Sequence, residues 1–269
     1  MRIATWNINS VTVREQRLRD WLASAAPDVL CLQELKTATA DFPLQVAADL
    51  GYEVAAHGTG RWNGVAVLSR VGLAEVVRDL PGQPRFDGAV EPRAIGATCG
   101  PVRVWSLYVP NGRSPDDPHY GYKLGWLDAL RDCAAAELAG GAPLLLLGDF
   151  NIAPTDEDVW DRAALEGSTH VTVPERDRLA DLTAAGLVEV VPRALKYDRN
   201  YTYWDYRQLA FPKNNGMRID LVYAAPGVAG AVTDAYVDRE ARKPGKAPKG
   251  GPKPVPPSDH APVVVDLDL

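Results

Sequence analysis

Apolar residues along the chain gather in short runs of five to eight, and most of these runs are followed at once by polar residues. Such runs are typical of strands that are buried on both faces. They predict strands at residues 2–8, 29–33, 64–69, 94–99, 102–109, 144–148, 218–224 and 261–267. Two other stretches repeat apolar positions at helical spacing, which predicts helices at residues 13–25 and 122–138.

Most of the predicted strands are separated by turns, and few are separated by helices. This order favours two packed sheets with helices outside them over a strictly alternating doubly wound sheet. We therefore expect an α/β fold (α+β in some schemes) that forms one domain over residues 1–269.

One segment, residues 239–257, is rich in Lys, Pro and Gly. Prolines and glycines at this density disfavour both helix and sheet, so we expect an exposed, flexible loop. It carries six cations against one acid, Glu240, and only twelve residues follow it, which is too few for a further domain.

The composition, 46% hydrophobic and 24% charged over 269 residues, is that of a globular protein and excludes a disordered chain or a small disulfide scaffold. No apolar run approaches the roughly 18 residues of a membrane span, and the N-terminus turns polar at once, unlike a signal peptide. The three cysteines lack metal-ligand spacing. These features predict a cytoplasmic protein without a membrane partner.

The net charge of −6 argues against a partner that binds by overall positive charge. Residues 193–257, however, hold twelve Lys or Arg against six Asp or Glu. A polyanion responds to the face it meets, so the composition remains compatible with an enzyme that acts on nucleic acid.

Polar side chains stand where the apolar strands stop. One such residue is usually a turn or a cap, but six clusters with four carboxylates, several Asn, a Tyr and a His can line one cleft. They are Asn7-Ile8-Asn9, Gln33-Glu34, Tyr108-Val109-Pro110-Asn111, Asp149-Phe150-Asn151, Asp220 and Ser258-Asp259-His260.

Carboxylate and amide oxygens without thiolates suit Mg²⁺ or Mn²⁺ rather than structural zinc. A hard cation beside a His, a Tyr and Asn donors matches phosphoryl transfer to water. The chain has neither a Walker-type phosphate loop nor a Ser or Cys nucleophile elbow. The residues therefore predict a metal-dependent phosphoesterase.

These residues, together with three further motifs, resemble the exonuclease III family of abasic-site endonucleases, in its bacterial branch, within the endonuclease/exonuclease/phosphatase superfamily. The motifs are Gln33-Glu34-Leu35-Lys36, Asn63-Gly64-Val65-Ala66-Val67 and Asn214-Asn215-Gly216-Met217-Arg218-Ile219-Asp220. The resemblance spans nearly the whole chain, and it implies a four-layered α/β sandwich of two mixed sheets with the active site at one edge.

The resemblance also implies roles for the residues at the strand ends. Glu34 is expected to be the main Mg²⁺ ligand, with Asn7 and Asp259 contributing. Asp149 and Asn151 are expected either to act on the attacking water or to bind metal. His260, oriented by Asp220, is expected to bind the scissile phosphate, to which Tyr108 and Asn111 donate hydrogen bonds.

Further residues are expected to contact double-stranded DNA with abasic sites or blocked 3′ ends. Tyr203 and Met217 are candidates for a wall against a base-less sugar, although the aromatic cluster around Tyr203 is equally explained by packing. The other candidates are Arg113, Asn214, Lys243 and Lys246.

With the resemblance included, three classes of function stay open. The first is a monomeric DNA-repair phosphodiesterase that cleaves 5′ to abasic sites and also has 3′→5′ exodeoxyribonuclease and 3′-end-cleaning activity. The second is a related phosphoesterase acting on RNA, an inositol phosphate or a phospholipid head group. The third is an inactive binding module, which the presence of Glu34, Asp149 and His260 disfavours.

Overall fold

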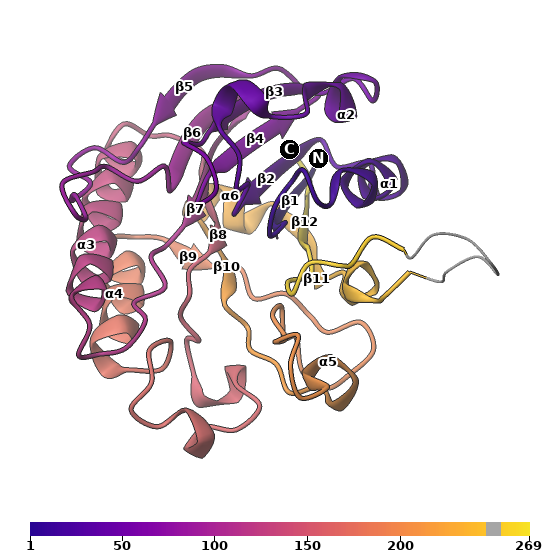
Figure 1. Ribbon diagram of the computed structural model, residues 1–269. Helices are drawn as coiled ribbons and strands as arrows, with labels where there is room; N and C mark the ends of the chain where they lie inside the picture. Colours follow the sequence, from indigo (N-terminus) through magenta and orange to yellow (C-terminus); the bar gives the residue numbers. More distant parts are fainter. Residues whose placement is uncertain (246–253) are drawn as a thin grey trace.

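The computed structural model, which describes residues 1–245 and 254–269, contains two six-stranded mixed sheets stacked face to face (Figure 1). The first has the strand order β11-β12-β1-β2-β4-β3, and the second has the order β5-β6-β7-β8-β10-β9. The strands are β1 (Arg2–Asn7), β2 (Val29–Gln33), β3 (Glu53–His57), β4 (Val65–Ser69), β5 (Ala74–Arg78), β6 (Ala94–Cys99), β7 (Val102–Tyr108), β8 (Leu144–Asp149), β9 (Val188–Glu189), β10 (Asp220–Ala224), β11 (Val232–Val237) and β12 (Val263–Leu267).

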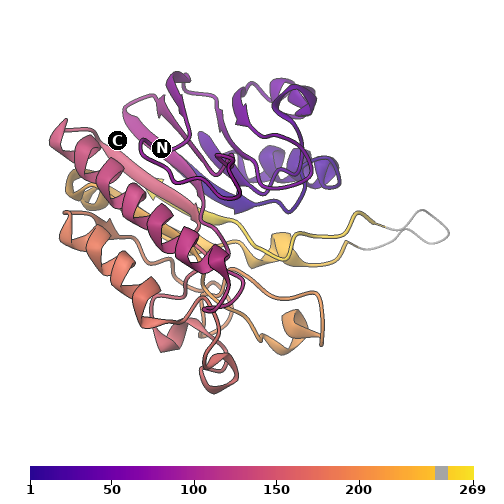
Figure 2. The ribbon, with the colours of Figure 1, turned by 60° about the vertical axis from the view of Figure 1, so that its left-hand side comes forward.

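Helices cover the outer faces of both sheets, which completes four layers (Figures 1 and 2). Helices α1 and α2 pack on the first sheet, and α3 and α4 lie side by side on the second. The helices are α1 (Glu15–Ala25), α2 (Leu44–Ala48), α3 (Pro118–Ala139), α4 (Val173–Ala184), α5 (Ala210–Lys213) and α6 (Pro226–Gly230), with 3-10 turns at Thr39–Asp41, Asp156–Asp158, Ala163–Leu165 and Arg239–Arg242. The predicted four-layered sandwich is confirmed.

Alternating residues of the central strands explain why these layers form. In β2, Val29 and Cys31 face the second sheet, whereas Leu30 and Leu32 face α1 and α2. A strand with both faces covered must be apolar throughout, which is the pattern in the sequence. No helix in the described part of the chain is long and apolar enough to cross a membrane.

Every predicted strand is present, whereas the two predicted helices begin at different residues from those expected. Helix α1 begins two residues later than predicted, at Glu15. Helix α3 begins four residues earlier, at Pro118, because the side chain of Asp117 accepts a hydrogen bond from His119 N at 2.8 Å and Pro118 fits the first helical position.

The prediction of an exposed loop over residues 239–257 is wrong at its start. Residues Arg239–Arg242 form a 3-10 turn, and Arg242 is only 5% exposed. The guanidinium groups of Arg239 and Arg242 lie 3.9 and 4.9 Å from the ring centre of Phe211, so cation–π contacts hold them against the protein. Residues 246–253, including Lys246, lie outside the described residues.

Candidate active site

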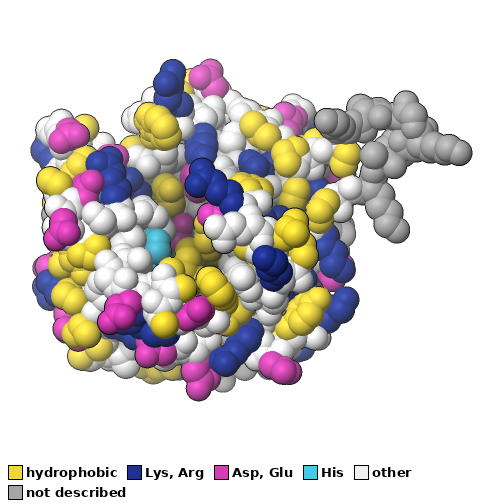
Figure 3. Space-filling view, turned by 60° about the horizontal axis from the view of Figure 1, so that its bottom comes forward, with side chains coloured by type: hydrophobic (Ala, Val, Ile, Leu, Met, Phe, Trp, Pro, Cys, Tyr) yellow, Lys and Arg dark blue, Asp and Glu magenta, His cyan; other side chains and the backbone are white. Residues whose placement is uncertain are grey.

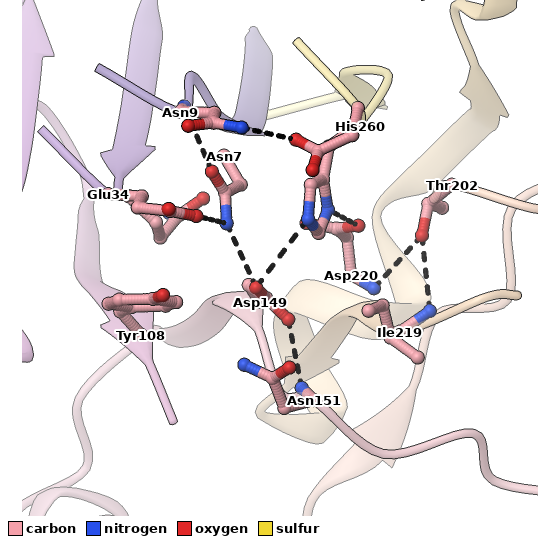
Figure 4. A network of polar contacts seen from close by, with 12 residues as sticks. Asn7, Asn9, Glu34, Tyr108, Asp149, Asn151, Thr202, Ile219, Asp220 and His260 are labelled. Atoms are coloured by element: carbon pink, nitrogen blue, oxygen red, sulfur yellow. Dashed lines mark hydrogen bonds and ion pairs between the residues drawn. The ribbon is translucent and has the colours of Figure 1, made fainter. Parts of the chain in front are cut away.

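The strand ends converge because the register of the second sheet places them side by side. Asp149 ends β8, opposite Tyr108 at the end of β7 and opposite Asp220 at the start of β10. In the first sheet, Asn7 at the end of β1 lies opposite Gln33, and Glu34 follows directly. The two packed sheets therefore present these polar groups at a shared edge, which Figure 4 shows from close by.

The side chain of Asn7 connects the two sheets. Its Nδ2 donates to Glu34 Oε2 and to Asp149 Oδ2, both at 2.9 Å. Asn7 is fully buried, so its amide holds the two carboxylates at a fixed separation (Figure 4). The prediction that Asn7, Glu34 and Asp149 belong to one site is consistent with this geometry.

A second chain of contacts runs along the first sheet to the C-terminal strand. Lys36 Nζ contacts Glu34 Oε1 and Asn9 Oδ1 at 2.7 Å each, and Asn9 Nδ2 donates to Asp259 Oδ1 at 2.9 Å. The backbone φ angles of Asn9, Glu34 and Lys36 are positive, at 47°, 57° and 52°. Non-glycine residues adopt this conformation at a cost, and such strain gathers at functional sites.

His260 lies between two carboxylates on the other side of Asp149. Its Nδ1 donates to Asp220 Oδ2 at 2.8 Å, and its Nε2 lies 3.8 Å from Asp149 Oδ2. All three side chains are almost fully buried (Figure 4). The Asp220–His260 pair expected from the sequence is therefore present in the structure.

The net effect of burial and neighbouring charges is to raise the pKa values of both Asp149 and His260. Burial raises the pKa of Asp149 to about 7, with nearby Asp220 adding to the effect and His260 opposing it. Burial lowers the pKa of His260, but Asp220 and then Asp149 outweigh it and raise that pKa to about 10. Near neutral pH the imidazolium form thus lies beside a carboxyl that exchanges its proton easily.

The donors predicted for the phosphate lie on the second sheet. Asn151 N donates to Asp149 Oδ1 at 2.9 Å, and Asn111 Nδ2 donates to Asn151 Oδ1 at 3.1 Å. The ring of Tyr108 lies 5.0 Å from the guanidinium of Arg93, and burial, with Glu34 adding to the effect, raises the pKa of its hydroxyl. The Tyr108 hydroxyl is therefore a neutral donor.

Beside His260 the surface is hollowed. A hollow of about 380 Å³ is lined by Tyr203, Met217, His170 and Trp160, and the ring of Tyr203 lies 5.0 Å from that of His260. Figure 3 shows this face, with acidic side chains and a histidine in its central depression and Lys and Arg around it. Tyr203 and Met217 thus line this hollow, and their contact with a base-less sugar stays a prediction.

The remaining residues predicted to contact DNA differ in the partners that their side chains have in the structure. The side chain of Arg113 is 58% exposed near Asn111 and lies 3.6 Å from Asp117. The side chain of Asn214 instead accepts a hydrogen bond from Trp204 Nε1 at 3.2 Å, and Lys243 Nζ pairs with Glu240 at 2.6 Å. Their contacts with DNA stay predictions.

Two residues that shape the centre, Thr202 and Lys36, were not predicted as site residues from the sequence. Thr202 Oγ1 accepts hydrogen bonds from the backbone N atoms of Ile219 and Asp220 at 3.1 Å, while Thr202 O accepts one from Ala261 N. It thereby joins β10 to the segment that carries His260 (Figure 4). The other is Lys36, which belongs to a quoted motif without an assigned role.

The oxygen-rich part of the site suits a hard cation. Glu34, Asp149 and Asp259 supply carboxylates at the same edge, and the Oδ1 atoms of Asn7 and Asn151 accept hydrogen bonds from Asn9 N and Asn111 Nδ2. Asp149 also lies in a group with Asp220 and His260 whose ligand atoms are within 4.8 Å of one another. Hard cations prefer oxygen ligands to an imidazole nitrogen, so the Glu34 side of Asp149, where Glu34 also contacts Lys36, fits such a cation better than the Asp220–His260 side.

Known proteins resemble this chain over nearly its whole length. The Endonuclease/Exonuclease/phosphatase family model matches residues 4–260. The 3′-5′ exonuclease NExo from Neisseria meningitidis is 36% identical with a TM-score of 0.90, and the 3′ phosphatase NExo from Neisseria bound to product DNA hairpin is 35% identical with the same score; all of each chain is covered.

Two further relatives extend this range. An AP endonuclease from Archaeoglobus fulgidus is 30% identical with a TM-score of 0.87, again over all of both chains. Exodeoxyribonuclease III from Haemophilus influenzae is 29% identical over 98% of both chains. The chain therefore belongs to the Endonuclease/Exonuclease/phosphatase family, and within it to the exonuclease III type.

Proposed function

We propose that this protein is a Mg²⁺-dependent phosphodiesterase that repairs DNA by processing blocked 3′ ends and by cleaving duplex DNA 5′ to abasic sites. The observation that carries the proposal is the position of Asp149, between the Asn7–Glu34 contact on one side and the Asp220–His260 pair on the other.

Hydrolysis requires a proton to leave water as its oxygen attacks phosphorus, while the bond to the leaving oxygen breaks. Asp149, with its raised pKa, is suited to accept this proton. His260 is suited to hold a non-bridging phosphate oxygen through Nε2–H, because Asp220 fixes its ring through Nδ1. Tyr108, Asn111 and Asn151 are suited to donate to the same phosphate.

Glu34 would be the main ligand of Mg²⁺, with further carboxylate oxygens from Asp259 and Asp149. Asn7 and Asn151 would add amide oxygens through the Oδ1 atoms that accept hydrogen bonds from Asn9 N and Asn111 Nδ2. When bound, a divalent cation neutralises charge on the phosphate and orients the leaving oxygen, and Mn²⁺ can substitute. The thiolate-free donor set supports this assignment over zinc.

The relatives support DNA as the substrate and differ in which lesion they process. NExo is a 3′-5′ exonuclease and 3′ phosphatase that was captured with a DNA hairpin product, whereas the Archaeoglobus protein is an AP endonuclease. NExo shares the higher identity, so 3′-end processing is our first expectation and abasic-site cleavage our second. The hollow beside Tyr203 and Met217 is the place for the terminal or base-less sugar.

A substrate panel tests the proposal. Purified protein would be incubated with duplex DNA carrying a 3′-phosphate, a 3′ recessed end or one tetrahydrofuran abasic mimic, and with a matched RNA duplex and inositol phosphate. We expect cleavage of the DNA substrates with Mg²⁺ and none with EDTA. Preferred cleavage of RNA or inositol phosphate would contradict the proposal.

We further propose that the protein is a monomer, which light scattering tests, and that it is located in the cytoplasm, which cell fractionation tests.

A further inference from the structure

A fully buried ammonium group lies behind the loops that carry the proposed phosphate donors. Lys123, on α3, is 0% exposed, and its Nζ donates to Asn151 O at 2.7 Å and Asn111 O at 3.2 Å. It also contacts Thr169 Oγ1 at 3.3 Å and Glu175 Oε1 at 2.5 Å. An ammonium has three protons, so these four oxygens use its whole donor capacity.

Its partner, Glu175, is also saturated. Oε1 accepts hydrogen bonds from Thr169 Oγ1 at 2.7 Å and His170 N at 3.0 Å, and Oε2 accepts from the backbone N and hydroxyl of Thr172. Burial raises the pKa of Glu175, but Lys123 and the hydroxyl donors outweigh this and lower it to about 2. Burial lowers the pKa of Lys123, and Glu175 opposes this shift. The hydrogen-bonded pair joins α3 to the start of α4.

Two of the oxygens that accept hydrogen bonds from Lys123 Nζ are the backbone carbonyls of Asn111 and Asn151, next to the proposed reacting centre. The side chains of Asn111 and Asn151 bind each other at 3.1 Å, and Asn151 Nδ2 donates to Val109 O at 3.0 Å. The backbone N of Asn151 donates to Asp149 Oδ1, and Asn151 has a positive φ of 52°. The ammonium thus holds the carbonyl of a strained residue whose amide orients Asp149.

The loop that follows Asn111 packs closely against Thr169 and the side chain of Lys123. A Cβ added to Gly112, whose φ is +90°, would lie 2.7 Å from Thr169 Oγ1 and 3.1 Å from Lys123 Cδ. Apolar residues often stabilise a core as well as a buried ion pair does, so such a pair is weak evidence for a stabilising role alone. Its contacts with two active-site carbonyls indicate a positional role.

We propose that Lys123 is a positioning residue that fixes Asn151, and through it Asp149, in the geometry needed for hydrolysis. The inference rests on the proposed function of Asp149 and Asn151. Lys123 does not contact the substrate, so its loss should lower kcat and leave DNA affinity nearly unchanged.

The test compares Lys123→Met with a matched control, Arg103→Met. Arg103 is a nearly buried cation that pairs with Glu137 at 3.1 Å at the other end of α3, away from the site. Assays would run well below both melting temperatures, with Kd measured on duplex DNA in Ca²⁺ without turnover. For Lys123→Met we expect kcat to fall about 100-fold, as for a small misplacement of reacting groups, with Kd changed less than about threefold. For Arg103→Met we expect a lower melting temperature and a kcat within about twofold of wild type.

The double variant Lys123→Met/Glu175→Gln distinguishes a loss of stability from a loss of positioning. It removes the carboxylate charge of Glu175 that Lys123→Met would leave unpaired, but it does not restore the hydrogen bonds to the carbonyls of Asn111 and Asn151. We expect its melting temperature to recover and its kcat to remain low; recovery of kcat with stability would overturn the proposal. If Lys123→Met does not fold, Thr169→Val carries the test, with kcat expected to fall at least about fivefold at unchanged Kd.

Unchanged kcat in Lys123→Met, or in Thr169→Val where that variant carries the test, overturns the inference alone, provided that the wild-type protein cleaves DNA. A wild-type protein that cleaves none of the DNA substrates overturns the proposed function and this inference together.

Discussion

Asp220 Oδ2 accepts a hydrogen bond from His260 Nδ1 at 2.8 Å, and both side chains are buried. The bond directs His260 Nε2 toward Asp149, 3.8 Å away. Asp220 therefore acts through His260, and we expect the two residues to be energetically coupled.

Substitution of this pair tests the coupling. His260→Ala should lower kcat about 1,000-fold, because it removes the proposed donor to the phosphate. Asp220→Asn should lower kcat as well, but the double variant should be within about threefold of His260→Ala alone. Single-turnover rates on one DNA substrate would measure this, and multiplicative losses would show that the two residues act independently.

The pKa shifts predict a bell-shaped dependence of kcat on pH. Asp149 accepts a proton only when ionised, and a bound cation lowers its raised pKa, so kcat should rise with pH at or below about pH 7. His260 donates only when protonated, so kcat should fall above about pH 10. Asp220→Asn removes the main charge that raises the pKa of His260, and it should move the alkaline limb to lower pH. An alkaline limb that stays in place would contradict this assignment.

Metal removal tests the role of Glu34. Activity should disappear in EDTA and return with Mg²⁺ or Mn²⁺. Because Glu34 is the proposed main ligand, Glu34→Gln should raise the Mg²⁺ concentration for half-maximal activity about 100-fold. A titration of activity against Mg²⁺ measures this, with Glu91→Gln as a control in a carboxylate that binds Arg93 instead. Wild-type cleavage in EDTA would exclude the metal.

The basic segment offers two cations with different expected effects. Arg242 is buried against Phe211 and Tyr206, so Arg242→Ala should lower the free energy of unfolding by about 2 kcal/mol. Lys243, if it contacts a phosphate, should instead set the salt dependence: Lys243→Ala should make the slope of log Kd against log salt shallower by about 0.9. Denaturant unfolding and DNA binding at several salt concentrations check the pair. A shallower salt dependence of Kd in Arg242→Ala but not in Lys243→Ala would contradict this assignment.

The strand ends were predictable because apolar runs mark buried strands, and the residue after each run must be at the edge. The pairing of Asp149 with Tyr108 and Asp220 was not, since register depends on the neighbouring strands. Helix α4 lacked a strong apolar stripe, although its capping box, Thr172 and Glu175, is a local signal.

The surroundings of the buried cations were not predictable, because their partners lie far away in the sequence. A lone Lys beside the predicted helical stripe, such as Lys123, reads as a solvated cation until Glu175 is known to lie against it. Arg239 and Arg242 read as mobile for the same reason, because their aromatic partners lie about 30 positions away in the chain. Charge runs predict exposure only where no partner packs on them.

The most direct test of the account is the single-turnover rate of Asp149→Asn on 3′-phosphate duplex DNA with saturating Mg²⁺, beside Kd for the same DNA. We predict a rate at least about 1,000-fold below wild type with Kd changed less than about threefold, because the role proposed for Asp149 is in the transition state. A rate within tenfold of wild type would contradict the central role of Asp149.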